Sequence, residues 1–139
     1  EAGMDHEYAG IQGIDSFIDK SIKLAYGENS SHYKEGKIAA IQSISGTGSI
    51  RVAMEFLRNF YPHKDAEVYT PDPTWPIHKT VQERVGYKCN EYTYYDRKAK
   101  KLDFGRMHSD LTKAPDGSIV FLHVCAHNPT GQDPSKSEW

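Results

Sequence analysis

Apolar residues recur at spacings of three and four along several stretches of the chain, the period of one face of an amphipathic helix. In the stretch 13–25 they are Ile14, Phe17, Ile18, Ile22 and Ala25. Gly27 follows as a stop signal, so the pattern predicts a helix here. Similar patterns predict helices over 50–61, 77–86 and 102–111, and DPSKSEW at 133–139 indicates the start of another.

Short apolar runs without this period predict strands over 38–44, 66–70, 87–95 and 118–126. A polar stretch at 28–37 is typical of a surface loop. Strands and helices alternate along the chain, and the apolar strands are not amphipathic. Such strands form parallel sheets covered on both faces. The sequence therefore predicts an α/β fold of three layers with a mostly parallel sheet.

Composition excludes some classes of partner. The 139 residues are 37% hydrophobic and 26% charged, with a formal net charge of −2. This balance argues against a nucleic acid or a membrane surface held by bulk electrostatics. Cys89 and Cys125 lack the spacing of metal ligands and lie in strand-like runs, so we expect buried free thiols. The chain opens at Glu1, and we expect a native start to precede it.

A glycine-rich segment, SGTGS at 45–49, separates a predicted strand from a predicted helix. Exposed N–H groups and the dipole at a helix start favour an anion such as phosphate, and serine and threonine hydroxyls can add donors. A plain strand-to-helix turn capped by Ser or Thr explains the same residues. Taken alone, the segment leaves both interpretations open.

Two further segments carry side chains suited to a site at the ends of apolar strands. PDPTWPIH at 71–78 is a rigid loop that can present the face of Trp75 to an aromatic ligand, or bury it as a core anchor. HVCAHNPTG at 123–131 can direct the amide of Asn128 into a cleft, while His123 suits a hydrogen-bonded core histidine. Loops at the ends of parallel strands converge, so we expect these two and 45–49 to share one edge of the sheet.

These motifs resemble one family. SGTGSIR, PTWPIH, LHVCAHNPTGQDP and the opening HEYAGIQGIDSF are similar in residues, order and spacing to aspartate aminotransferases. These are the class I branch of the fold-type I pyridoxal-phosphate enzymes. The resemblance covers essentially the whole chain but well under half of a full-length member. It implies that residues 1–139 are part of the large, cofactor-binding domain, with 1–12 a lead-in segment near the dimer interface. Ala9 and Ile77 depart from the family's usual residues.

The resemblance also implies roles for individual residues around pyridoxal 5′-phosphate. Ser45, Gly46 and Thr47 would hold the phosphate through N–H groups and hydroxyls. Trp75 would stack on the pyridine ring, and its indole N–H would reach the substrate's distal carboxylate. Asn128 would donate to the ring's phenolic oxygen, which favours the charged phenolate.

Other residues would act around this core of the site, again by resemblance. His78 and His123 would support the acidic partner of the pyridine nitrogen. Tyr8 would reach the phosphate of the neighbouring subunit in a homodimer with shared active sites. Gly13 lies in the segment that approaches the α-carboxylate of the substrate. The family's cofactor loops also imply cis bonds before Pro73 and Pro129.

The resemblance implies that the parent protein transfers the amino group of aspartate to 2-oxoglutarate. Free thiols indicate a reducing compartment, so we expect the cytoplasm, with mitochondria as the alternative. The family's Schiff-base lysine, the aspartate facing the pyridine nitrogen and the substrate-binding arginines lie beyond HNPTG. We therefore assign no catalytic residue and expect this chain alone to be inactive. The alternatives are an aromatic amino-acid aminotransferase, which shares every motif here, and a non-catalytic phosphate-binding module.

Overall fold

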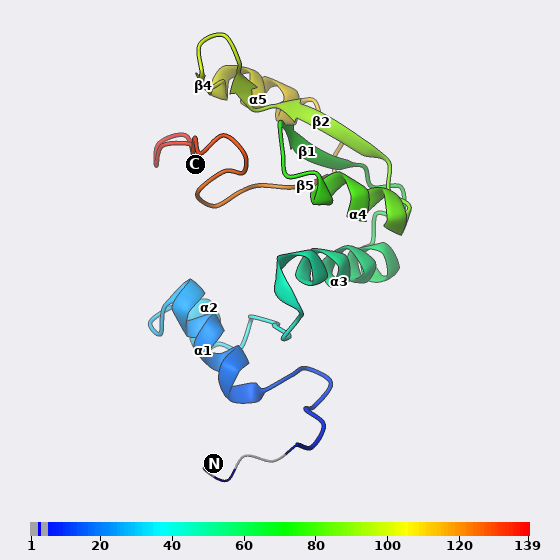
Figure 1. Cartoon of the computed structure of the whole chain (residues 1–139), viewed down its shortest axis with the longest axis vertical. Helices are drawn as coiled ribbons and strands as arrows, with labels where there is room; N and C mark the ends of the chain where they lie inside the picture. Colours follow the sequence, from blue (N-terminus) through cyan, green and yellow to red (C-terminus); the bar gives the residue numbers. More distant parts are fainter. Residues whose placement is uncertain (1–2, 4–5) are drawn as a thin grey trace. The chain divides into compact units, whose positions relative to one another are not determined.

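The computed structural model describes residue 3 and residues 6–139, and the chain divides into two compact units, residues 1–45 and 46–139 (Figure 1). The described helices are α1 (Asp15–Tyr26), α2 (Ser31–Lys34), α3 (Ser45–Phe60), α4 (Ile77–Val85) and α5 (Phe104–Thr112). The described strands are β1 (Val68–Asp72), β2 (Cys89–Thr93), β3 (Tyr95–Asp96), β4 (Lys101–Leu102) and β5 (Ile119–Val120). None of the described helices is both long enough and apolar enough to cross a membrane.

The first unit is built on α1 and α2, and α2 lies within the stretch 28–37 that was predicted to be entirely loop. The predicted helix at 13–25 is confirmed as α1, and the N–H of Gly27 bonds back to the Lys23 carbonyl at 2.8 Å. The Tyr33 hydroxyl on α2 donates to Asp19 Oδ1 on α1 at 2.7 Å. Neither helix contains a buried residue. Polar contacts on the surface, rather than a core, therefore tie the two helices together.

The strand predicted over 38–44 is wrong, because the structure has no strand there. The backbone N–H of Gln42 instead bonds to the carbonyl of Gln12 at 2.8 Å. Ile41 and Ile44 are exposed. The run is apolar and β-branched, as strands are, but its hydrogen bond goes to a local turn and not to a sheet.

The second unit contains a three-stranded parallel sheet with the order β2-β1-β5, in which β1 pairs with both neighbours. Val68 lies opposite Cys89 on one side and Ile119 on the other. The predicted strand 118–126 is confirmed only at its start. One further backbone bond, from Phe121 N–H to the Tyr69 carbonyl at 2.8 Å, follows β5.

Helices cover both faces of this sheet. Val68 packs in a cluster with Met54 of α3 and Val81 of α4. Tyr69 points to the opposite face, because side chains alternate along a strand. It packs in a second cluster that contains Met107 of α5. The predicted three-layer α/β arrangement is therefore confirmed, and a short antiparallel pair, β3 and β4, is attached beside it.

Local signals set the ends of the helices. Gly86 adopts a left-handed conformation (φ 88°) after α4, as a C-terminal stop requires. The Asp103 carboxylate caps α5 by accepting the N–H of Arg106 at 3.1 Å. The segment SGTGS differs from the prediction, since α3 already begins at Ser45. Residues 45–49 are thus the first turn of the helix itself, with Ser45 at φ 58°.

The strands end toward a single edge of the sheet, because they are parallel. We call this the carboxyl edge. The loop after β1 leads through Trp75 into α4, Tyr94 follows β2, and residues 121–133 follow β5. The peptide bonds before Pro73 and Pro129 are both cis, as predicted. The fold therefore delivers two of the three predicted loops to the same edge.

Candidate cofactor site

A hollow of about 410 Å³ lies at the carboxyl edge of the sheet. We call it the carboxyl-edge hollow. Its lining comes from α3, the loop into α4 and the segment after β5, and consists of Ile50, Trp75, His78, Phe121, Leu122, His123, Cys125 and Asn128. Four predicted site residues, Trp75, His78, His123 and Asn128, therefore share one cavity.

Trp75 is held by the start of α4. The His78 N–H bonds to the Trp75 carbonyl at 3.0 Å, which closes the first turn. The His78 ring meets the indole edge to face, with centroids 5.6 Å apart and an interplanar angle of 84°. Trp75 is only half-buried, while His78 is buried. The indole is thus fixed against the protein by the histidine and still borders the hollow.

Hydrogen bonds link the two predicted histidines through Thr74. The backbone N–H of Asn128 donates to Nδ1 of His123 at 3.2 Å, so the neutral imidazole carries its proton on Nε2. That Nε2 lies 3.3 Å from Thr74 Oγ1, which in turn lies 2.8 Å from Nδ1 of His78. If His123 donates to the hydroxyl, the hydroxyl donates to His78. The chain of donors then leaves the His78 proton on Nε2.

The electrostatics of the cavity keep both rings neutral. Burial lowers the pKa of His78, and the nearby His123 lowers it further. Burial also lowers the pKa of His123, although Asp133 acts in the opposite direction. Near pH 7, Nδ1 of His123 can therefore accept the Asn128 N–H, and Nδ1 of His78 can accept the Thr74 hydroxyl. The two histidines serve as a fixed polar link across the cavity wall.

The amino-terminal turn of α3 carries the predicted phosphate-binding residues. Ser45, Gly46 and Thr47 are all exposed and begin α3, which is 16 residues long. Ile50, one turn further along, lines the carboxyl-edge hollow. N–H groups in the first turn of a helix have no partner within the helix and favour anions. The predicted phosphate-binding residues therefore lie in the first turn of α3, ahead of a residue that lines the hollow.

The remaining two predicted residues lie in the first unit. Tyr8 is fully exposed, at 102% of its reference area. Gly13 adopts φ 101°, and a β-carbon added there would lie 2.3 Å from Cβ of Gln42. Oε1 of Gln42 also accepts the N–H of Ile14 at 2.9 Å. Only glycine fits this turn without displacing Gln42.

Sequence reasoning missed Thr74, although it lies within the quoted motif PDPTWPIH. A threonine between prolines gives no signal of its own, and only the fold places it between two histidines. The expectation of a buried thiol is wrong for Cys125, which is exposed and lines the carboxyl-edge hollow. The strand that was predicted to bury it ends at Val120.

Comparison with known proteins gives one consistent picture. The family described as "Aminotransferase class I and II" matches residues 1–139. The mitochondrial aspartate aminotransferase of Schizosaccharomyces pombe is 52% identical over 136 residues, which cover 98% of this chain and 30% of that protein. The cytoplasmic aspartate aminotransferase of Saccharomyces cerevisiae superposes with a TM-score of 0.94 at 38% identity, covering 100% of this chain and 33% of that one.

A further solved structure shows the cofactor. The aromatic-amino-acid aminotransferase of Burkholderia pseudomallei, covalently bound to pyridoxal phosphate, superposes with a TM-score of 0.94 at 34% identity. The match covers 99% of this chain and 34% of that one. The chain thus spans about a third of the length of each of these relatives. The match over the whole chain and the agreement in fold show that it belongs to the class I and II aminotransferase family.

Proposed function

We propose that the complete protein carrying this chain is a pyridoxal-phosphate-dependent aspartate aminotransferase, which moves an amino group from aspartate to 2-oxoglutarate. The observation that supports it best is the shared cavity. Trp75, His78, His123 and Asn128 come from two distant segments and line one hollow at the carboxyl edge. Relatives named aspartate aminotransferase, at 38–52% identity, favour aspartate as the substrate.

The residues present fit this cofactor. Trp75 offers a flat, half-buried face to a pyridine ring, and the exposed Asn128 amide offers a donor to the ring's phenolic oxygen. The first turn of α3, with Ser45, Gly46 and Thr47, offers donors to the phosphate. Bound there, the cofactor would supply an electron sink for the amino acid's α-carbon. The chain's own residues bind and orient it.

His78 and His123 would act behind this layer. With the donors ordered from Asn128 through Thr74, the proton of His78 lies on Nε2, at the far end of the chain of hydrogen bonds. We assign it to the acidic partner of the pyridine nitrogen. A neutral donor stabilises that carboxylate without adding a second positive charge to the site.

Tyr8 and Gly13 would complete the site in a homodimer. The full exposure of Tyr8 leaves its hydroxyl available to the phosphate in a neighbouring subunit. The turn at Gly13, held by Gln42, would approach the substrate's α-carboxylate. Replacing Tyr8→Phe in the complete protein should weaken retention of pyridoxal phosphate without changing the melting temperature. Unchanged retention would argue against the role.

Binding of pyridoxamine 5′-phosphate to this chain tests the proposal, because that ligand has no aldehyde to label surface lysines. Quenching of Trp75 fluorescence reports the event, and Trp139→Phe removes the other tryptophan. We expect binding about tenfold or more tighter than that of pyridoxamine without phosphate, or about 1.4 kcal/mol. Trp75→Phe should weaken binding, measured by calorimetry, whereas Trp139→Phe should not. Equal affinity for the two ligands would contradict the phosphate site.

Turnover separates aspartate from the aromatic alternative. The complete protein should have a kcat/KM for aspartate at least about tenfold above that for phenylalanine. This chain alone, incubated with pyridoxal phosphate and reduced with borohydride, should show scattered substoichiometric labelling and no turnover. A single stoichiometric label together with aspartate-dependent turnover would show that the catalytic lysine lies within these residues.

A further inference from the structure

The segment that carries Asn128 is held by bonds on both sides of it. We call residues 126–133 the asparagine loop. The Asp133 carboxylate accepts the backbone N–H of Ala126 at 2.7 Å and that of His127 at 2.9 Å. The Gly131 N–H closes the turn by bonding to the His127 carbonyl at 2.7 Å. These bonds fix the internal shape of the loop. They do not attach the loop to the sheet.

Tyr94 supplies that attachment. It follows β2 and is 2% exposed. Its backbone is fixed on both sides, because its N–H bonds to the Asp72 carbonyl at 3.2 Å and its carbonyl accepts the Asp103 N–H at 2.9 Å. Its hydroxyl donates to the Gln132 carbonyl in the asparagine loop at 2.6 Å. A rigid tyrosine on the sheet thus holds one end of the loop.

The other contact is a ring stack. The His127 imidazole lies on the Tyr94 ring, with centroids 3.8 Å apart and an interplanar angle of only 12°. His127 is 1% exposed, and its Nδ1 lies 2.8 Å from Thr130 Oγ1. Burial, and secondarily the nearby His123, lower the pKa of His127 to about 4. The ring is therefore neutral near pH 7, and it packs on Tyr94 as an aromatic plate without a charge to desolvate.

We propose that Tyr94 and His127 form a clamp that positions Asn128 for the cofactor, which makes them positioning residues rather than catalytic ones. Asn128 directly follows His127, and its own N–H reaches Nδ1 of His123. Its side chain is exposed and lines the carboxyl-edge hollow, so the backbone of the loop sets the point and direction from which the amide enters that hollow. The inference rests on the proposed function for the identity of the ligand, but the clamp itself is a property of the fold.

The test compares substitutions in the complete protein. Tyr94→Leu removes both the stack and the hydroxyl, and Tyr94→Phe removes only the bond to Gln132. Tyr92→Phe is the matched control. Tyr92 is equally buried, and its hydroxyl donates to the Phe121 carbonyl at 2.8 Å, outside the asparagine loop. Both phenylalanine variants therefore lose one buried hydroxyl-to-carbonyl bond of similar length.

The first readout needs no cofactor. Amide hydrogen exchange at Ala126, His127 and Gly131 should become about tenfold faster in Tyr94→Leu and several-fold faster in Tyr94→Phe. Tyr92→Phe should leave these amides unchanged. Equal exchange in Tyr94→Phe and Tyr92→Phe would overturn the clamp, and this comparison holds even if Tyr94→Leu fails to fold.

The second readout asks whether the clamp acts through Asn128. With pyridoxal phosphate bound, Tyr94→Leu should raise the pH at which the cofactor absorbance titrates by about half a unit, as Asn128→Ala should, because a donor to the charged oxygen is lost. Adding Tyr94→Leu to Asn128→Ala should give no further shift. Additive shifts would overturn the positioning role. A protein that shows the exchange effect but binds no pyridoxal phosphate would instead contradict the proposed function.

Discussion

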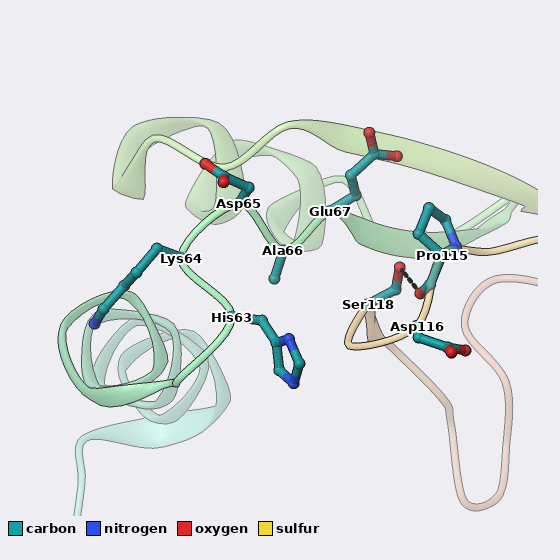
Figure 2. A pocket seen from close by; sticks show the side chains of 8 residues that line it. All are labelled: His63, Lys64, Asp65, Ala66, Glu67, Pro115, Asp116 and Ser118. Carbon is teal, nitrogen blue, oxygen red and sulfur yellow. Dashed lines mark hydrogen bonds between the residues drawn. The ribbon is translucent and has the colours of Figure 1, made fainter.

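Each of the two edges of the parallel sheet carries a hollow, and the two hollows differ in how the polar side chains that line them are hydrogen-bonded. The carboxyl-edge hollow measures about 410 Å³ and the one at the amino edge about 250 Å³. The amino-edge hollow precedes β1 and β5 and is lined by His63, Lys64, Asp65, Ala66, Glu67, Pro115, Asp116 and Ser118 (Figure 2). Figure 2 shows Lys64, Glu67 and Asp116 pointing away from one another.

Two charged side chains at the amino edge are engaged by residues that do not line the hollow. Lys64 Nζ donates to the Asn59 carbonyl at 2.8 Å, and Glu67 forms an ion pair with Lys88. At the carboxyl edge, by contrast, Thr74 joins His78 to His123 within the wall of the cavity. Volume alone therefore does not distinguish a binding site. Convergent polar groups with fixed proton positions do.

The largest expected effect follows from removing the central hydroxyl of the carboxyl edge. Thr74→Val keeps the shape but leaves a nitrogen on each of two histidines without its partner. We expect a loss of about 2–3 kcal/mol in the free energy of unfolding, measured with urea, and weaker binding of pyridoxamine 5′-phosphate. Ser118→Ala at the amino edge removes a local 2.6 Å bond to the Pro115 carbonyl and should cost less than about 0.5 kcal/mol. Equal losses of unfolding free energy in the two variants would contradict the proposed difference between the two edges.

Acid should weaken the carboxyl edge next. The pKa of His127 is lowered from 6.5 to about 4 by burial, so the unfolded chain binds more protons than the folded one between these values. The folded state therefore loses no stability to the titration of His127 above pH 6.5, and it loses stability progressively as the pH drops from 6.5 toward 4. We expect roughly 2 kcal/mol to be lost between pH 7 and pH 5. His127→Phe, which retains a ring against Tyr94, should flatten this dependence; an unchanged slope would assign it elsewhere.

Backbone geometry, rather than bonding between side chains, shapes the amino edge. Gly117 has φ 81°, and a β-carbon there would lie 2.6 Å from Cγ of His63. Gly117→Ala should therefore cost about 1–2 kcal/mol in thermal or urea unfolding. Combining it with His63→Ala should recover part of that loss by removing the steric conflict. No recovery would mean that the left-handed backbone alone sets the cost.

The smallest effect concerns charge. Lys64→Ala and Asp116→Ala remove opposite charges from the amino-edge hollow, and both side chains are exposed. Affinity for pyridoxamine 5′-phosphate should change less than about twofold, because these exposed charges lie at the opposite edge of the sheet from the proposed site and are screened by solvent and salt. A tenfold loss in Lys64→Ala would place the phosphate at the wrong edge of the sheet.

Periodicity and glycine signals were sufficient for α4 and α5, but the helix predicted to begin within 133–139 is wrong, because the structure has only a turn there. The helices ending at Gly86 and entered through Asp103 lie where the sequence predicts them, since those signals act locally on the backbone. The strand predicted at 38–44 failed because an apolar β-branched run does not specify its partner. Gln42 bonds to the turn at Gln12, and no pattern of spacing announces that choice.

The candidate site was predictable in part for a similar reason. Trp75 and Asn128 occur in distinctive motifs, and parallel strands bring such motifs together. Thr74 and Tyr94 owe their roles to contacts with residues far along the chain, at 3.3 Å to His123 and 2.6 Å to Gln132. Long-range contacts of this kind depend on tertiary packing, so a single sequence does not reveal them.

The strand order has a consequence for synthesis on the ribosome. The central strand β1 pairs with β2 and with β5, and Val68 gains its second neighbour only when Ile119 has left the exit tunnel. At roughly 5–20 residues per second, the nascent chain carries an unfinished sheet for some seconds. During that interval one flank of β1 is an open template for other chains. We therefore expect chaperone demand to peak late in the synthesis of this segment and to subside once β5 docks.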